Sequence, residues 1–262
     1  MYKEHEAFTP PPPDAILWRY MDFTKFVSLL EKQALFFARA DKLEDPFEGA
    51  WPNSSREAAQ KFLKRLTNLN HHKLWELSLT FIRALPRFTL INCWHESDHE
   101  SAAMWELYSK DSNGIALKTN FGSLAKSFTT NEVVHIGEIN YIDYETVGFY
   151  GNQWWFSAFL YKRESFEYER EVRAIVQIIP PGNRILPLGH QDEGTEGVID
   201  LSQNICEMGH YYEVNLSILI HEVIVDPYAP DWFLELVQSV ADRYNLESPV
   251  IRSTLADNPT WD

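Results

Sequence analysis

The sequence of 262 residues contains only two cysteines, Cys93 and Cys206. Two thiols cannot build the disulfide framework of a small secreted protein, and such low usage is typical of a reducing cytosol. No stretch approaches ~18 consecutive apolar residues, so we expect no membrane-spanning helix. The opening MYKEHEAFTPPPPD lacks the apolar core of a signal peptide. We therefore expect a cytoplasmic protein.

Basic residues are also few. The chain has 23 lysines and arginines against 38 aspartates and glutamates, a net charge of −15. An excess of negative charge repels the phosphate backbone of nucleic acids, and it offers no polybasic anchor to an anionic membrane. We therefore expect neither a nucleic acid nor a membrane as a partner.

Common catalytic and metal motifs are missing as well. The sequence has no P-loop, no G-x-G-x-x-G, no G-x-S-x-G and no H-E-x-x-H. The segment CWHESDH places Cys93, His95 and His99 close together, a combination that could hold zinc. Because this segment crosses from a predicted strand into a predicted helix, the three side chains need not converge. We expect no metal site.

What the sequence does contain is enough apolar material for a core. Hydrophobic residues make up 45% and aromatic residues 14% of the chain, as in a globular protein. The length suits one large domain or two small ones. Residues 1–14, with the stiff run Pro10–Pro13, read as an extended N-terminal lead. Residues 15–262 are then expected to form a single domain.

Apolar alternation, β-branched residues and capping residues predict alternating elements along the domain. Strands are expected at residues 15–20, 35–40, 88–94, 114–119, 133–142, 169–179, 221–227 and 249–255. Helices are expected from the cap Asp22 to about Lys32, and at residues 55–85 in two parts, 100–109, 153–161 and 231–244. This mixture predicts an α+β fold with a mixed, mainly antiparallel sheet and flanking helices.

One segment, FEYEREVRAIVQ at residues 166–177, combines charge with a β-branched tail. In a strand, Glu169, Glu171 and Arg173 would project from the same face. Three interpretations fit. The charges form cross-strand ion pairs on a solvated face, they form a buried network with Arg19 and Arg39, or they line a binding cleft. In a cleft, the carboxylates would hold sugar hydroxyls and the arginines a phosphate.

Two further segments offer candidate site residues. In LEDPFEG, Asp45 and Glu48 flank the rigid Pro46 and could hold a guanidinium or a ribose hydroxyl, or they are an ordinary turn and a surface charge. In MWELY, Trp105 and Tyr108 could stack on an aromatic ring, or they simply pack in the core.

Eight short motifs in order resemble the bacterial proteins grouped as domain of unknown function family 2971. This resemblance covers nearly the whole domain, and the family carries no established activity. The motifs are LWRY (17–20), FFARADKLEDPFEG (36–49), NCWHES (92–97), AMWELYSKDSNGIAL (103–117), INYIDY (139–144), KRESFEYEREVRA (162–174), VIVDP (223–227) and RSTL (252–255).

The order of elements is also similar to that of the ADP-ribosyltransferase fold. Those enzymes begin with a strand carrying Arg or His and end with a strand or loop carrying a key glutamate. Arg19 would match the first, and Glu169 or Glu171 the last. At residues 38–40 this chain has Ala-Arg-Ala, where many relatives place a serine or threonine. The resemblance implies NAD as cofactor, with the arginine on the dinucleotide and the glutamate on the nicotinamide ribose.

These observations predict one polar cleft and leave two functions open. As an ADP-ribosyltransferase-like enzyme, for which a toxin or phage-defence effector would be a natural setting, the protein would use Glu171, Glu169 and Arg19 in catalysis. The alternative is a non-catalytic module that senses a nucleotide or binds a protein partner, with a structural Arg/Glu network. The expected ligand-binding residues are Tyr20, Asp45, Glu48, Trp105, Tyr108 and Arg173.

Overall fold

A nine-stranded, mainly antiparallel sheet organises the structure, a computed structural model that describes residues 1–66, 79–109, 113–147, 154–178 and 205–259. Within these residues, only the pair β10–β11 of this sheet is parallel. The strands are β1 (Ile16–Asp22), β2 (Ala34–Arg39), β3 (Thr89–Glu96), β4 (Gly114–Asn120), β5 (His135–Glu138), β8 (Glu171–Gln177), β9 (Gly209–Glu213), β10 (Glu222–Val225) and β11 (Val250–Arg252).

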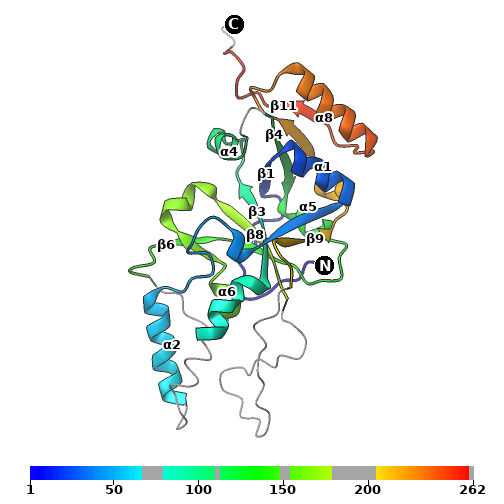
Figure 1. The fold of residues 1–262 in the computed structure, drawn as a ribbon. Coiled ribbons are helices and arrows are strands. Elements are labelled where there is room, and N and C mark those ends of the chain that lie inside the picture. The colour runs from blue at the N-terminus through cyan, green and yellow to red at the C-terminus, as the bar shows by residue number, and fades with distance from the viewer. Residues whose placement is uncertain (67–78, 110–112, 148–153, 179–204, 260–262) are drawn as a thin grey trace.

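Helices and a second, two-stranded sheet flank this sheet, as Figure 1 shows. The short strands β6 (Asn140–Ile142) and β7 (Tyr161–Arg163) pair in parallel. The α+β class with a mainly antiparallel sheet is thus confirmed. The helices are α1 (Phe23–Lys32), α2 (Asn53–Leu66), α4 (Ala102–Tyr108), α5 (Phe121–Ser127), α6 (Trp154–Ser157), α7 (Leu216–Leu219) and α8 (Asp231–Arg243).

The sheet branches at β3. On one edge, β8 pairs with β3 over residues 89–95. The opposite edge is shared, because β2 pairs with β3 at residues 90–91 and β1 pairs with it at residues 95–96. Between them, residues 92–94 face no strand of the described chain on that edge. We call this place the β1–β2 gap, and it matters for the candidate site.

The start of α1 follows the capping rule that the sequence predicts. Asp22 ends β1 in an extended conformation, and its Oδ1 accepts a hydrogen bond from the backbone N–H of Lys25 at 2.8 Å. A cap of this kind stabilises a helix by about 1 kcal/mol. Phe26, Leu29 and Leu30 then lie on the buried side of the helix.

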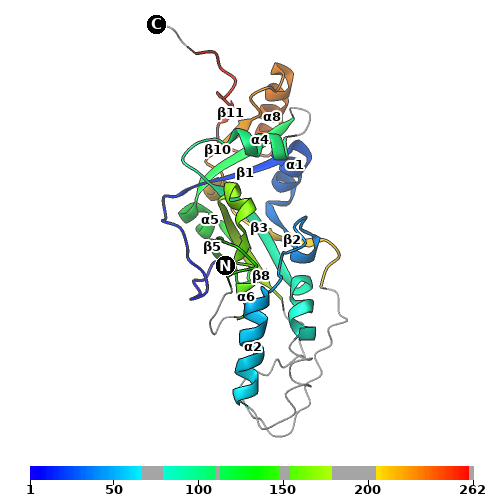
Figure 2. The ribbon, with the colours of Figure 1, turned by 90° about the vertical axis from the view of Figure 1, so that its left-hand side faces the viewer.

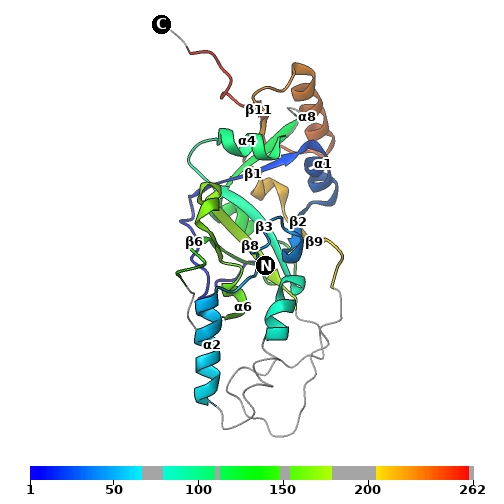
Figure 3. The same cartoon turned by 60° about the vertical axis from the view of Figure 1, so that its left-hand side comes forward.

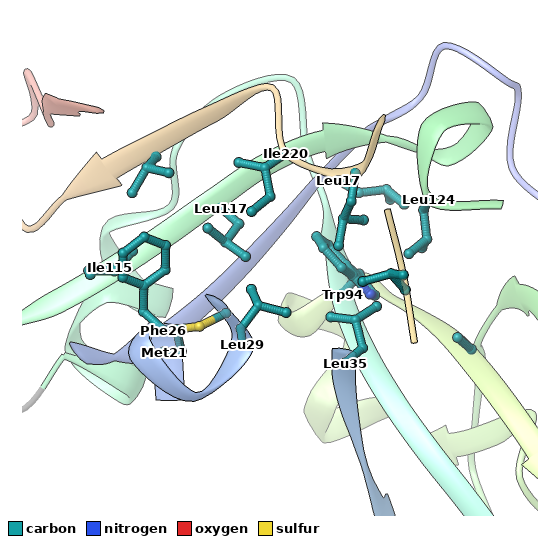
Figure 4. Packing of buried hydrophobic residues seen from close by; sticks show 14 of the residues in the cluster. Leu17, Met21, Phe26, Leu29, Leu35, Trp94, Ile115, Leu117, Leu124 and Ile220 are labelled. Atoms are coloured by element: carbon teal, nitrogen blue, oxygen red, sulfur yellow. The ribbon is translucent and has the colours of Figure 1, made fainter. Parts of the chain in front are cut away.

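The main core lies on the face of the sheet that α1, α5 and α8 cover. Figure 4 shows Leu17, Trp94, Leu117 and Leu124 converging there with Leu29 of α1. The opposite face carries smaller clusters. One of them joins Trp18, Tyr20, Met104, Trp105, Ala116 and Ile224, and it fixes α4 on the side of β1 opposite to α1, as Figures 1 and 3 show.

Helix α2 extends away from the sheet, at the opposite end of the molecule from α8, as Figures 1 and 2 show. Two helices were predicted within residues 55–85. The structure describes residues 53–66 and 79–84 of this region, and both segments are helical. The intervening break lies outside the described residues. Among the described helices, none has the length and apolar character that a membrane crossing requires.

Two predictions of local structure were wrong. The expected helix at 153–161 is only the single turn of α6, followed by β7. The expected strand at 133–142 is divided into β5 and β6, which belong to different sheets. Tertiary contacts override local propensity in both cases. The predicted N-terminal lead, residues 1–14, packs against the domain, since Lys3 N donates to Val134 O and Phe8 is buried.

Candidate ligand-binding site

The segment FEYEREVRAIVQ is not one continuous strand. Residues Glu164–Glu169 form a 3-10 helix, and Arg170 adopts the left-handed conformation at φ 39° before β8 begins at Glu171. Glu171 and Arg173 therefore share a strand face as predicted, whereas Glu169 reaches the same region from the preceding helical turn. The prediction of a strand through Glu169 was wrong because the chain turns at Arg170.

Arg173 is fully buried and uses all five of its N–H donors. Its Nε and Nη2 donate to Glu171 at 2.8 and 2.9 Å, and its Nη1 and Nη2 donate to Glu48 at 2.8 and 2.5 Å. Nη1 also donates to Phe159 O at 3.0 Å. A guanidinium has five donors, so a phosphate could reach Arg173 only by displacing one of these protein acceptors.

Glu171 is held in its ionised form by the same contacts. Burial raises the pKa of its carboxyl, but Arg173 and Lys162 outweigh burial and lower this pKa to about 2. Lys162 Nζ lies 3.3 Å from Glu171 Oε2, and the backbone N–H of Glu171 donates to Tyr141 Oη at 2.7 Å. Glu171 is 5% exposed, so it is a buried anion with committed oxygens.

Glu48 reaches Arg173 because the loop after β2 is tightly folded. Asp45 Oδ1 accepts from Phe47 N at 3.0 Å, and Glu48 N donates to Asp45 O at 3.0 Å. Gly49 follows at φ 71°, and a Cβ there would lie 2.8 Å from both Phe159 and Pro86. This position requires glycine, and it brings the carboxylate of Glu48 into the cluster.

Two basic side chains of β7, Lys162 and Arg163, form ion pairs with the remaining predicted carboxylates. Lys162 Nζ forms a short ion pair with Glu169 Oε2, and Arg163 Nη2 lies 2.7 Å from Asp45 Oδ1. Burial raises the pKa of Glu169, and Lys162 opposes this shift. We call Glu48, Lys162, Glu169, Glu171 and Arg173 the Arg173 cluster.

Arg19 occupies the β1–β2 gap rather than the Arg173 cluster. Its Nη1 donates to Cys93 O at 2.5 Å, which satisfies a carbonyl that has no strand partner in the described sheet. The guanidinium also lies 5.9 Å from the ring centroid of Trp94. The side chain is partly exposed, and among the described residues no carboxylate forms an ion pair with it.

Tyr108, at the end of α4, connects this region to a hollow in the surface. Burial raises the pKa of its phenol to about 12, and the nearby Cys93, Glu169 and Glu171 add to the shift. The same groups act on Arg19, whose pKa burial lowers while Cys93, Tyr108 and Glu171 raise it. Arg19 and Tyr108 therefore share one electrostatic environment beside the Arg173 cluster.

Tyr20 and Trp105 serve mainly as packing residues. Their rings meet edge to face at 5.0 Å, and both side chains are buried. Tyr20 Oη accepts from Ser101 N at 2.9 Å, just before α4. Trp105 Nε1 donates to Glu100 Oε2 at 3.1 Å. These contacts hold α4, and with it Tyr108, over β1.

The structure thus brings the predicted residues together in two groups and adds others. Arg39, considered as a member of the network, donates to Asp41 instead. Reasoning from sequence missed Lys162, Arg163 and Tyr141, and it considered Cys93 only as a possible zinc ligand. Lys162 and Arg163 stand in the motif KRESFEYEREVRA, so the signal was present, but their partners are distant in sequence.

Cys93 and His95 lie on the same face of β3, beside Arg173 and Glu171 of β8 respectively. Burial raises the pKa of the Cys93 thiol well above its ordinary value. His95 Nδ1 donates to Glu169 O at 2.6 Å. Within the part of the chain that the structure describes, no group of three His, Cys, Asp or Glu side chains is arranged to hold a metal ion.

Comparison with known proteins adds no relative: no protein-family profile, no curated protein and no solved structure matches the chain.

Proposed function

We propose that this protein binds a small nucleotide, with Arg19 as the contact to its phosphate and the Arg173 cluster as the rigid support. The observation that supports the proposal is that the two arginines differ in how many of their N–H donors are already hydrogen-bonded to the protein. Arg173 has no free donor, whereas the one described hydrogen bond of Arg19 is to Cys93 O. A planar guanidinium with uncommitted N–H groups suits the paired oxygens of a phosphate.

Ion pairing, and not net charge, supports this assignment. The Arg173 cluster with the neighbouring Asp45–Arg163 pair contains four carboxylates and three cations, joined by ion pairs. Arg19 is the fourth cation, so the set is neutral without a ligand. Within the described chain, however, Arg19 forms no ion pair of its own, so its guanidinium can still pair with an anionic ligand.

A second candidate function is ADP-ribosyl transfer from NAD. The observation that favours it is the environment of Glu169. Its carboxylate has a raised pKa and its side chain is 14% exposed, so it is more accessible than Glu171. A carboxylate with a perturbed pKa beside a candidate ligand site is a candidate catalytic group. Glu169 would bind the nicotinamide ribose and stabilise its developing positive charge, and Glu171 would support it.

Ligand-dependent thermal stability tests the binding proposal. We expect ADP-ribose or NAD, at about 100 times its dissociation constant, to stabilise the protein by about 2.7 kcal/mol. The same measurement with ATP and GTP shows which base the site prefers. Arg19→Gln should abolish the stabilisation, and Arg252→Gln, at another partly exposed arginine, should not. If no nucleotide stabilises the wild type, or if Arg19→Gln responds like the wild type, the proposal fails.

Consumption of NAD separates the enzyme from the binding module. If the protein is a transferase, Glu169→Gln should abolish release of nicotinamide while preserving the NAD-induced thermal shift. The matched control is Glu167→Gln, an exposed glutamate of the same 3-10 helix. The wild type is assayed with candidate acceptor proteins present. If it binds NAD without consuming it, the transferase proposal fails and the protein is a non-catalytic binding module.

A further inference from the structure

A cavity of about 370 Å³ lies where β1 ends, between α1, the end of α4 and the first turns of α8. Small-molecule sites usually have volumes of about 300–1,000 Å³. Most of its walls are apolar or aromatic, and Tyr108 is one of them. The lining residues are Asp22, Phe23, Thr24, Tyr108, Ser109, Asn113, Gly114, Trp232, Phe233 and Leu236.

The aromatic and aliphatic side chains at this cavity are not all needed for the fold. Helix α8 is anchored in the main core by Phe233, Val237 and Ala241. Trp232 and Leu236 belong to the same helix but are 59% and 39% exposed at the cavity. Large apolar side chains gathered around a surface hollow mark a site for a ligand or partner.

The wall formed by Tyr108 is held in a fixed position. Ser109 Oγ forms a short hydrogen bond to Asp226 Oδ2. Gly114 lies against Ser109 so closely that a Cβ would meet its Oγ at 2.3 Å. The end of α4 is therefore fixed against β4, and the tyrosine ring is presented to the cavity without a loop movement.

Charge around the cavity selects the kind of ring that fits. Among its lining residues, Asp22 is the charged one, and its hydrogen bonds with Thr24 and Lys25 outweigh burial and lower its pKa. Its Oδ2 lies 3.0 Å from Nζ of the exposed Lys25, and this oxygen can also accept a hydrogen bond from an N–H group of a ligand. The cavity thus suits an uncharged ring with an amino group, and its described lining holds no cation for a phosphate.

We propose that this cavity receives the amino-bearing heteroaromatic base of the nucleotide, stacked against Trp232 and Tyr108. This inference rests on the proposed function, because the cavity lies at the end of β1, where Asp22 lines it three residues beyond Arg19 on the same strand. The base would lie on the cavity side of Tyr108 and the phosphate on the Arg19 side. Asp22 and Asn113 would provide polar contacts to the edge of the base.

Calorimetric titration with three probes tests whether the base binds in the cavity and the phosphate binds at Arg19. The probes are ADP-ribose, ribose 5-phosphate and adenosine. We expect Trp232→Ala to weaken ADP-ribose binding about tenfold, in line with the usual worth of one base-stacking contact, and to leave ribose 5-phosphate unchanged. Arg19→Gln should weaken ribose 5-phosphate and leave adenosine unchanged. Leu236→Gln provides a second cavity variant.

The control is Tyr228→Ala, an aromatic residue that is 75% exposed but does not line the cavity. Unchanged ADP-ribose affinity in both cavity variants, with loss in Arg19→Gln, would overturn the cavity assignment and preserve the proposed function. Adenosine binding that depends on Trp232 in a protein with no affinity for ribose 5-phosphate would support the cavity and overturn the phosphate contact. No binding of any probe to the wild type would overturn both.

Discussion

Two arginines on neighbouring parts of one sheet, Arg173 and Arg19, have opposite surroundings. Arg173 is fully buried and gives every donor to protein oxygens, four of its five hydrogen bonds going to carboxylates. Arg19 lies in the β1–β2 gap and donates to the Cys93 carbonyl. Both are charged and both were candidates for the same role. The comparison teaches that the number of uncommitted donors, not charge alone, separates a structural arginine from one available to a ligand.

The origin of this difference is the branching of the sheet. Where β8 pairs with β3, Arg173 stands above a continuous ladder and β7 and the loop after β2 close over it. Where β1 leaves β3, the ladder stops and a carbonyl remains for Arg19. The continuous ladder carries a complete network, and at the interruption the Cys93 carbonyl accepts from Arg19 instead of from a strand.

Replacing Arg173 should have the largest effect. Arg173→Met leaves Glu48 and Glu171 buried without their shared cation, a change that costs ~3–5 kcal/mol. Thermal melting should show a fall on the order of 10 °C, since 1 kcal/mol corresponds to roughly 2–4 °C for chains of about this size. Arg252→Met, which removes a surface ion pair with Asp231, should change stability by under ~1 kcal/mol. Equal melting temperatures for the two variants would contradict the structural role of Arg173.

Neutralising Glu171 should have an intermediate effect and a pH signature. Glu171→Gln weakens hydrogen bonds to charged partners, which are worth about 1.5–3 kcal/mol each. Because the folded pKa of about 2 lies below the ordinary 4.5, the unfolded chain binds the proton first as pH falls. The stability from Glu171 is therefore present above pH 4.5 and is lost between pH 4.5 and 2.

Urea unfolding at several pH values measures that contribution. The difference in unfolding free energy between wild type and Glu171→Gln should shrink as pH falls from 4.5 towards 2. A difference that stays constant over this range would show that the carboxylate of Glu171 is not held ionised by Arg173 and Lys162.

Replacing Arg19 should have the smallest effect on stability. Arg19→Gln loses one described hydrogen bond, to Cys93 O, so we expect a change of about 1 kcal/mol or less. Nucleotide-induced stabilisation should nevertheless disappear. If Arg19→Gln instead destabilises the protein as strongly as Arg173→Met, Arg19 balances the cluster as a structural charge and the contrast between the two arginines is lost.

Local signals predicted much of the fold. The cap Asp22 and the extents of α1 and α8 were predicted correctly from spacing, since both helices carry strong 3.6-residue periodicity. Short elements such as β9 and α7 were not predicted, because four or five residues carry too little pattern. Arg170 in the left-handed conformation gave no sequence signal, so the position of Glu169 was misread.

The candidate site was predictable as a list of charged residues and not as an arrangement. Asp45, Glu48, Glu171 and Arg173 do meet in space or through β7, as both the cleft and the buried-network interpretations required. The sequence could not show which of these residues remain accessible to a ligand, because their accessibility depends on contacts with Lys162, Arg163 and Phe159. Phe159 comes from a segment that was predicted to be a helix, and Lys162 and Arg163 directly follow that segment.

The sequence by itself determined the class of fold, the acidic character and the presence of alternating charge at the start of β8, because these follow from composition and local periodicity. Only the tertiary structure decided which charges neutralise one another. Hydrogen bonds between side chains 125 residues apart, such as Glu48 and Arg173, depend on how loops and strands pack. That packing buried Arg173 among acceptors and left Arg19 with one hydrogen bond within the described chain, to the Cys93 carbonyl.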